Sequence, residues 1–75
     1  MSNNVDVSER LAAAIVALRK RIGKSQAQLA RDSAVTQAEL CRFERGERTP
    51  NVAMLCKLAG GLNTTASEVL AEAGL

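Results

Sequence analysis

Two pairs of polar residues with the same spacing occupy the middle of the chain. Ser25 stands three residues before Gln28, and Thr36 three residues before Glu39. With this spacing, a hydroxyl at the start of a helix and a longer polar side chain at its third position can each accept a hydrogen bond from the other residue's backbone amide. Because the two pairs lie eleven residues apart, they predict two short helices joined by a tight turn. This helix-turn-helix arrangement indicates DNA as the ligand.

Residues for catalytic or metal chemistry are scarce. The chain has no histidine, and its two cysteines, Cys41 and Cys56, are fifteen residues apart. That spacing supports neither a zinc site nor a disulfide framework, so we expect free thiols. The sequence also lacks a nucleotide-binding loop and paired carboxylates in a recognisable catalytic setting. It therefore predicts a protein that is not an enzyme and that binds no metal, cofactor or small-molecule ligand.

Length and composition favour one all-α domain. Of the 75 residues, 47% are apolar, Phe43 is the only aromatic residue and there is a single proline, which favours helices over strands. We expect residues 1–75 to form one domain, with residues 1–6 as a flexible arm. No segment resembles a secretion signal or is long enough to span a membrane. A cytoplasmic location without membrane contact is expected.

Positive charge is concentrated around the predicted helix-turn-helix. The net charge is only +2, but eight of the ten basic residues and four of the eight acidic residues lie between Arg19 and Arg48. This segment therefore carries an excess of four positive charges, while the rest of the chain is negative by two. The distribution fits contact with DNA phosphates, although a solvated helical face could show the same bias.

Apolar periodicity and turn residues predict three further helices. The first runs from about Val7 to Ile22, with Asp6 and Glu9 as its cap pair. A fourth helix covers about Val52–Gly60 and is closed by the glycine pair at 60 and 61, and a fifth begins after Thr65 and ends near Ala73. The residues expected to form the core are Leu11, Ile15, Leu18, Ile22, Leu29, Ala30, Val35, Leu40, Leu55, Leu58, Leu62, Val69 and Leu70.

A series of residues in a fixed order resembles a known family. The series consists of Leu18-Arg19, Gly23, Ser25-Gln26, Leu29-Ala30, Val35-Thr36, Leu40, Phe43-Glu44, Gly46, Pro50, Leu55, Leu58-Ala59 and Leu62. It is similar to the lambda-repressor-like (Cro and phage-repressor) helix-turn-helix family over residues 9–71. The resemblance implies a compact five-helix DNA-binding domain in which helices 2 and 3 form the helix-turn-helix.

Three residues depart from the pattern of that family. Ala34 stands in the turn where the family commonly has glycine, and Ser33 precedes it where a large apolar residue is common. Glu47 occupies a position that is often basic. The first two departures indicate a strained turn, and the third removes one expected phosphate contact.

The resemblance implies roles for the residues of the second motif helix. Gln37 and Ala38 occupy positions that contact bases in this family, and Arg42 falls on the same face one turn later. Glutamine can pair with adenine, arginine with guanine, and the alanine methyl can touch that of thymine. Two alternatives stay open: Gln37 as a solvated residue of the first turn, and Arg42 as a phosphate contact.

Other positions are expected to hold the DNA backbone or the fold. The residues expected to contact phosphate are Ser25, Gln26, Arg45 and Arg48; surface arginines that only aid solubility are the alternative. The resemblance also implies that Arg19 and Glu44 form a structural salt bridge between the first and third helices.

Apolar residues near the carboxyl end suggest a second subunit. Val69, Ala73 and Leu75, with the loop before the fourth helix, are expected to form a homodimer interface. The predicted function is a sequence-specific transcriptional regulator, most simply a repressor, that binds double-stranded DNA in the major groove at an inverted repeat. The alternatives are an antitoxin or restriction-modification controller on the same scaffold, and a protein-interaction adaptor that does not bind DNA.

Overall fold

The computed structural model describes residues 3–75, with side chains from Val7 onward, and this part of the chain is entirely helical apart from its turns. This confirms the expected all-α, five-helix fold. No described helix is both long and apolar enough to cross a bilayer. The helices are α1 (Asn3–Arg21), α2 (Gln26–Ser33), α3 (Gln37–Glu44), α4 (Val52–Gly61) and α5 (Ala66–Glu72).

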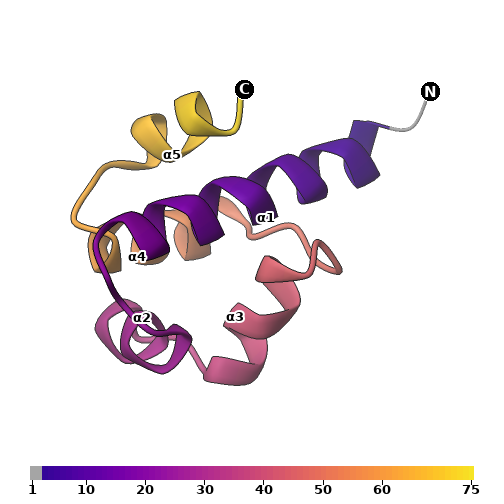
Figure 1. Ribbon diagram of the computed structural model, residues 1–75. Coiled ribbons are helices and arrows are strands. Elements are labelled where there is room, and N and C mark those ends of the chain that lie inside the picture. The colour runs from indigo at the N-terminus through magenta and orange to yellow at the C-terminus, as the bar shows by residue number, and fades with distance from the viewer. Residues whose placement is uncertain (1–2) are drawn as a thin grey trace.

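The helices pack around α1, which runs across the whole molecule (Figure 1). It contacts α3 on one side and α5 on another, while α2 packs against α3 and α4. The helix-turn-helix formed by α2 and α3 therefore projects from one side of α1, away from α5 (Figure 1). The largest fully buried side chains are Phe43, Ile15, Leu29, Leu40, Leu58 and Val69.

Most of the expected core is confirmed, with one error and several omissions, of which Phe43 is the largest side chain. Ile22 is 40% exposed, because it follows the last residue of α1, where the chain turns away from the core. Phe43 was not among the expected core residues, yet it is buried within the central cluster. Leu18, Val35 and Leu70 are partly buried against that cluster. The central apolar cluster thus contains side chains from all five described helices.

The first helix starts earlier than its apolar periodicity indicates. It begins at Asn3, so position 6 lies inside the helix and the expected cap pair of Asp6 and Glu9 is wrong. No glycine or proline stands between Asn3 and Val7 to stop the helix. The expected flexible arm over residues 1–6 lies partly outside the described residues.

Every described helix ends in the same way. Just past each end, one residue adopts a positive φ and two backbone amides donate to carbonyl groups of the last turn. At the end of α2, the amide of Ala34 donates to Arg31 O at 3.2 Å and that of Val35 to Ala30 O at 3.0 Å. These bonds satisfy carbonyl groups that a helix otherwise leaves without partners. The residues with positive φ are Gly23, Ala34, Gly46, Asn63 and Gly74.

The expectation that Gly60 and Gly61 close the fourth helix is wrong. Both belong to α4, and Asn63 supplies the positive φ of 60° after its end. Gly61 instead allows α4 to approach α2, because a Cβ atom added to it would overlap Ser33 Oγ and lie 3.0 Å from Leu29 Cδ1. Ser33 is buried there, and its hydroxyl has no hydrogen-bond partner in the described part of the chain. The two small residues therefore set the spacing of α2 and α4.

The carboxyl end packs onto α1. Arg21 Nη2 lies 3.2 Å from Glu72 Oε2, and Val69 is fully buried while Ala73 is 9% exposed. The expectation that Val69 and Ala73 face a second subunit is therefore wrong, because α5 uses both to cover the core of its own chain. Of the three residues expected at a dimer interface, Leu75 remains at the surface, with 52% of it exposed.

Ala34 provides a test of strain in the turn between α2 and α3. Its φ of 57° and ψ of 39° are left-handed, which costs a residue with a Cβ atom about 1–2 kcal/mol. Glycine adds unfolded-state entropy worth only about 0.4–1 kcal/mol. Ala34→Gly should therefore raise the free energy of unfolding by up to about 1 kcal/mol, as measured by urea denaturation.

The matched control is Ala17→Gly, at an exposed position inside α1. This change should lower the free energy of unfolding by about 1 kcal/mol, since the backbone there is helical. A loss of stability in both variants would contradict a strained turn at Ala34.

Candidate nucleic-acid interface

The two capping boxes predicted from the sequence are confirmed. Ser25 Oγ accepts from the amide of Gln28 at 3.1 Å, and Gln28 Oε1 accepts from the amide of Ser25 at 2.8 Å. At the start of α3, Thr36 Oγ1 and Glu39 Oε1 each accept from the other residue's amide at 3.0 Å. The boxes fix Gln26 and Gln37 as the first residues of α2 and α3.

Glu39 places a negative charge at the start of α3. Its capping hydrogen bonds with Thr36 hold the side chain in that position. Hydrogen bonds from the backbone and side chain of Thr36 lower the pKa of its carboxyl group, and the positive charges of Arg48 and Lys57 lower it further. The carboxylate is therefore ionised at neutral pH and directed toward the helix start. Nearby cations offset the repulsion that it would exert on a phosphate.

The outer face of α3 carries the three residues expected to read bases. Gln37, Ala38 and Arg42 are all exposed, whereas Leu40 and Phe43 on the opposite face are buried. No hydrogen bond or ion pair engages the side chains of Gln37 and Arg42 in the described part of the chain. The donors and acceptors of this face are thus available to an external partner.

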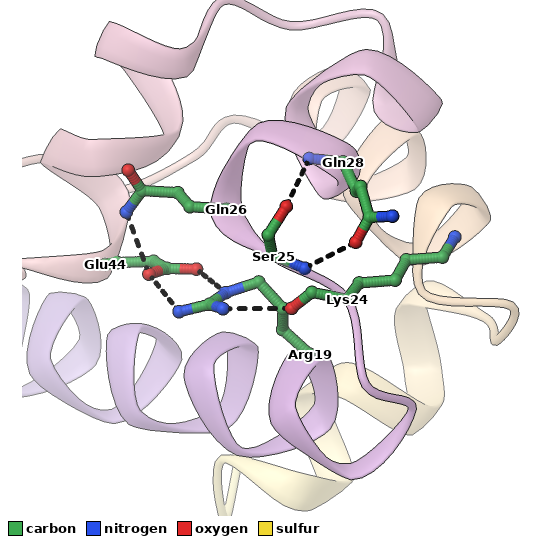
Figure 2. A network of polar contacts seen from close by, with 6 residues as sticks. All are labelled: Arg19, Lys24, Ser25, Gln26, Gln28 and Glu44. Carbon is green, nitrogen blue, oxygen red and sulfur yellow. Dashed lines mark hydrogen bonds and ion pairs between the residues drawn. The ribbon is translucent and has the colours of Figure 1, made fainter.

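Arg19 and Glu44 connect α1 to the end of α3 (Figure 2). Arg19 Nε donates to Glu44 Oε2 at 2.7 Å, and Arg19 Nη2 donates to Glu44 Oε1 at 3.0 Å. The same guanidinium donates from Nη1 to the carbonyl oxygen of Lys24 at 3.0 Å. Only 14% of the Arg19 side chain and 7% of the Glu44 side chain are exposed. This two-pronged, nearly buried contact holds α3 in a fixed orientation against α1.

Lys24 is a structural residue that sequence reasoning missed. Its Nζ atom donates to the carbonyl oxygen of Gly61 at 2.5 Å and lies 2.8 Å from Asp32 Oδ2. The hydrogen bond from Lys24 lowers the pKa of the Asp32 carboxyl group. Lys24 thus joins the turn after α1 to both α2 and α4. No spacing in the sequence signals this contact, because its partners come from two later helices.

Three of the four residues expected to contact phosphate lie near the carboxyl end of α3. Gln26 reaches the carboxyl end of α3, where its Nε2 atom donates to Glu44 Oε1 at 3.0 Å. Arg45 and Arg48 follow that end in the chain; Arg45 Nη1 lies 3.7 Å from Glu47 Oε2, and the Arg48 guanidinium lies 6.0 Å from the centre of the Phe43 ring. The Ser25 hydroxyl is exposed but already accepts a hydrogen bond in its capping box.

The basic side chains of the helix-turn-helix segment differ in whether a carboxylate of the same chain neutralises them. Arg19 and Lys24 are each paired with a carboxylate and are mostly buried. Arg42, Arg45 and Arg48 are exposed, and among these three only Arg45 forms an ion pair in the described part of the chain, with Glu47 at 3.7 Å. The positive charge on the surface around α3 therefore comes from Arg42, Arg45 and Arg48. Arg19 and Lys24 contribute little to it, because their charges are paired.

The family model HTH_3, described as helix-turn-helix, matches residues 15–69. That range contains α2, α3 and α4 in full. The chain belongs to the HTH_3 helix-turn-helix family. This confirms the resemblance to Cro and phage-repressor domains.

Solved structures of HTH_3 regulators share this fold. An HTH_3 family transcriptional regulator from Vibrio cholerae is 35% identical with a TM-score of 0.86; the match covers 91% of this chain and 38% of that protein. The clp gene regulator ClgR from Corynebacterium glutamicum is 29% identical with a TM-score of 0.85, covering 91% of this chain and 88% of that one.

A third similar structure is the restriction-modification controller protein C.AhdI from Aeromonas hydrophila. It is 27% identical with a TM-score of 0.79, and the match covers 83% of this chain and 94% of that one. Among curated protein sequences, none matches this chain. The HTH_3 domain therefore has the fold of transcription regulators rather than that of an enzyme family.

The buried pair of Arg19 and Glu44 leads to a stability prediction. Removing one partner, as in Arg19→Met or Glu44→Leu, leaves a buried charge without its counter-charge and should lower the free energy of unfolding by about 3–5 kcal/mol. The double variant should lose much less, because no unpaired charge remains. Urea denaturation of all three variants measures the coupling.

The exposed pair of Arg21 and Glu72 is the control. The Arg21 side chain is 62% exposed, so removal of either partner should cost no more than about 1 kcal/mol. Losses that simply add in the Arg19 and Glu44 double variant would mean that the pair does not act as a buried unit.

Proposed function

We propose that this HTH_3 domain is a sequence-specific DNA-binding transcriptional regulator, most simply a repressor. The observation that carries the proposal is the outer face of α3, where Gln37, Ala38 and Arg42 are exposed. Gln37 and Arg42 also have unused hydrogen-bonding groups on this face. An α-helix fits the width of the major groove, so α3 can bring this face to the edges of the bases.

Each of the three side chains suits a different base. The Gln37 amide can donate to and accept from adenine, Arg42 can donate twice to guanine, and the Ala38 methyl can contact that of thymine. Gln37 and Ala38 are at the first turn of α3, the part that enters the groove most deeply in this docking mode. Arg42 lies one turn later and reads a base or holds a phosphate.

Contacts with the DNA backbone would position α3 in the groove. Gln26 and Ser25 lie at the amino end of α2, where free backbone amides and the helix dipole favour phosphate. Arg45 and Arg48 follow the carboxyl end of α3, the end whose Glu44 accepts the Gln26 amide. Phosphate contacts from α2 and from the segment after α3 would fix the orientation of the domain without selecting a base sequence.

We also propose that the regulator binds as a homodimer. Two copies related by a two-fold axis would read an inverted repeat, with their α3 helices about 34–36 Å apart. Val69 and Ala73 are buried in the chain's own core, so a second copy would contact other apolar residues. In the described part of the chain, the large apolar side chains that are exposed are Ile22, Leu75 and Val52, which is 77% exposed at the start of α4.

A restriction-modification controller is the second candidate. It is favoured by the match to C.AhdI, because this chain covers 94% of that controller protein. Such a protein would bind an operator with the same surface, and its gene would adjoin that of a nuclease; an antitoxin gene would adjoin that of a toxin. An adaptor that does not bind DNA is the outcome to exclude by experiment.

Selection of bound duplexes from a random library tests the proposed function. We expect an inverted repeat to be enriched, two chains to bind each duplex, and affinity to fall steeply as salt increases. Sedimentation and fluorescence anisotropy measure stoichiometry and affinity. A monomer at high protein concentration that binds no duplex at low salt would refute the proposal and favour the adaptor.

Base-reading and phosphate-holding residues should respond differently to substitution. Gln37→Ala should change the preferred bases and weaken binding to the selected site by about 1–3 kcal/mol. Arg48→Ala should weaken binding to all sequences alike and reduce the salt slope by about one. Binding to a panel of single-base operator variants at two salt concentrations separates the two effects.

The same panel assigns Arg42. If Arg42→Ala changes the ranking of the operator variants, Arg42 reads a base. An unchanged ranking with a weaker salt dependence would make it a phosphate contact. Lys20→Ala, on the exposed side of α1, is the charge-matched control and should leave the ranking unchanged.

A further inference from the structure

Glu44 binds more than its partner in the ion pair. Its Oε1 atom accepts from Arg19 Nη2 and from Gln26 Nε2, each at 3.0 Å, while its Oε2 atom accepts from Arg19 Nε at 2.7 Å. Figure 2 shows the guanidinium and the amide converging on one carboxylate from α1 and α2. The carboxylate at the end of α3 thus meets both other helices that frame the candidate interface.

The contact fixes the orientation of the Gln26 amide. A carboxylate only accepts hydrogen bonds, so the Nε2 side of the amide, and not its oxygen, must face Glu44. The Gln26 oxygen points away from the carboxylate (Figure 2). An amide nitrogen carries two hydrogens, and one of them is used by Glu44. The other remains able to donate to a phosphate oxygen.

We propose that Glu44 is a positioning residue for DNA binding, which orients the Gln26 amide before the phosphate arrives. This inference rests on the proposed function, because it gives a role to the phosphate contact at the start of α2. An unrestrained glutamine has three rotatable bonds and must be ordered when it binds. In this chain, Glu44 removes much of that freedom in the unbound state.

Shared use of one carboxylate also links the contact to the fold. Arg19 holds Glu44 from the side of α1, at a site where both side chains are mostly buried. Gln26 is only half-buried, so it connects this rigid pair to the surface. The ion pair of Arg19 and Glu44 therefore orients both α3 and the Gln26 side chain of α2. The DNA-contacting groups proposed on the two helices are thus held at a fixed distance and angle to each other.

A double-mutant cycle between positions 26 and 44 tests the proposal. Dissociation constants would be measured for the selected duplex with the unchanged chain, Gln26→Ala, Glu44→Gln and the double variant, at a temperature where all four are folded. Gln26→Ala should weaken binding about tenfold, as expected for a hydrogen bond to a charged group. Glu44→Gln should weaken it about threefold or more, through the lost ordering of Gln26.

The decisive result is the effect of Glu44→Gln in the Gln26→Ala background. If Glu44 acts through Gln26, it should cause no further loss there. An equal fold-loss in both backgrounds would mean a general structural effect and would overturn the proposal. Combining Glu44→Gln with Arg48→Ala is the control, and those two losses should multiply, because Arg48 makes no contact with Glu44 in the described structure.

Two further measurements remain informative if Glu44→Gln does not fold. Glu44→Asp retains the charge opposite Arg19 but withdraws the carboxylate from Gln26, and it should reproduce the loss of affinity. Nitrogen-15 relaxation of the side-chain amides in the free protein should show Gln26 ordered and the unpartnered Gln37 mobile. Equal mobility of the two amides would overturn the proposal.

These outcomes are distinct from failure of the proposed function. If the unchanged chain binds no duplex, the proposed function and the inference fail together. If it binds an inverted repeat while the substitutions at 26 and 44 act independently, the function stands and only the inference fails.

Discussion

The contact between Arg19 and Glu44 is the constraint on which the arrangement of the helix-turn-helix depends. The apolar core can hold α3 against α1, but dispersion contacts alone tolerate small rotations. The two-pronged ion pair has a fixed geometry and is mostly buried, so a rotation of α3 would break charged hydrogen bonds in a poorly solvated place. The outer face of α3 bears the exposed polar groups, so the orientation of α3 determines where those groups point. A rigid internal contact therefore sets the direction in which these exposed groups point.

Local features of the structure could be predicted from the sequence because they depend on neighbouring residues. The boxes of Ser25 and Thr36 place the starts of α2 and α3 at the expected residues. The positive φ of Ala34 could also be anticipated, although from the resemblance, because the family commonly has glycine at this turn position. The buried periodicity of α1 and α4 follows from apolar spacing in the same way. Each of these inferences concerns groups within one or two turns of each other.

Features that depend on contacts between distant segments could not be obtained in this way. Whether Val69 covers its own core or a second subunit depends on where α5 packs, and apolar spacing is the same in both cases. Lys24 meets Gly61 and Asp32 only because α2 and α4 are adjacent. The expectation that Val69 and Ala73 face a second subunit was wrong for this reason. The exposed residues of α3 were assigned more easily, since a resemblance over most of the chain supplied the missing tertiary information.

The close approach of Ser33 and Gly61 has a consequence for how this sequence can diverge. A larger side chain at either position would collide with the other helix, because a Cβ atom on Gly61 already overlaps the serine hydroxyl. A large apolar residue at position 33, which the resemblance led us to expect, would therefore fit only if α4 moved outward. Such a shift would also separate Lys24 from the Gly61 carbonyl. Positions 24, 33 and 61 should therefore change together during evolution, and substitutions transferred singly from relatives should fail at these sites.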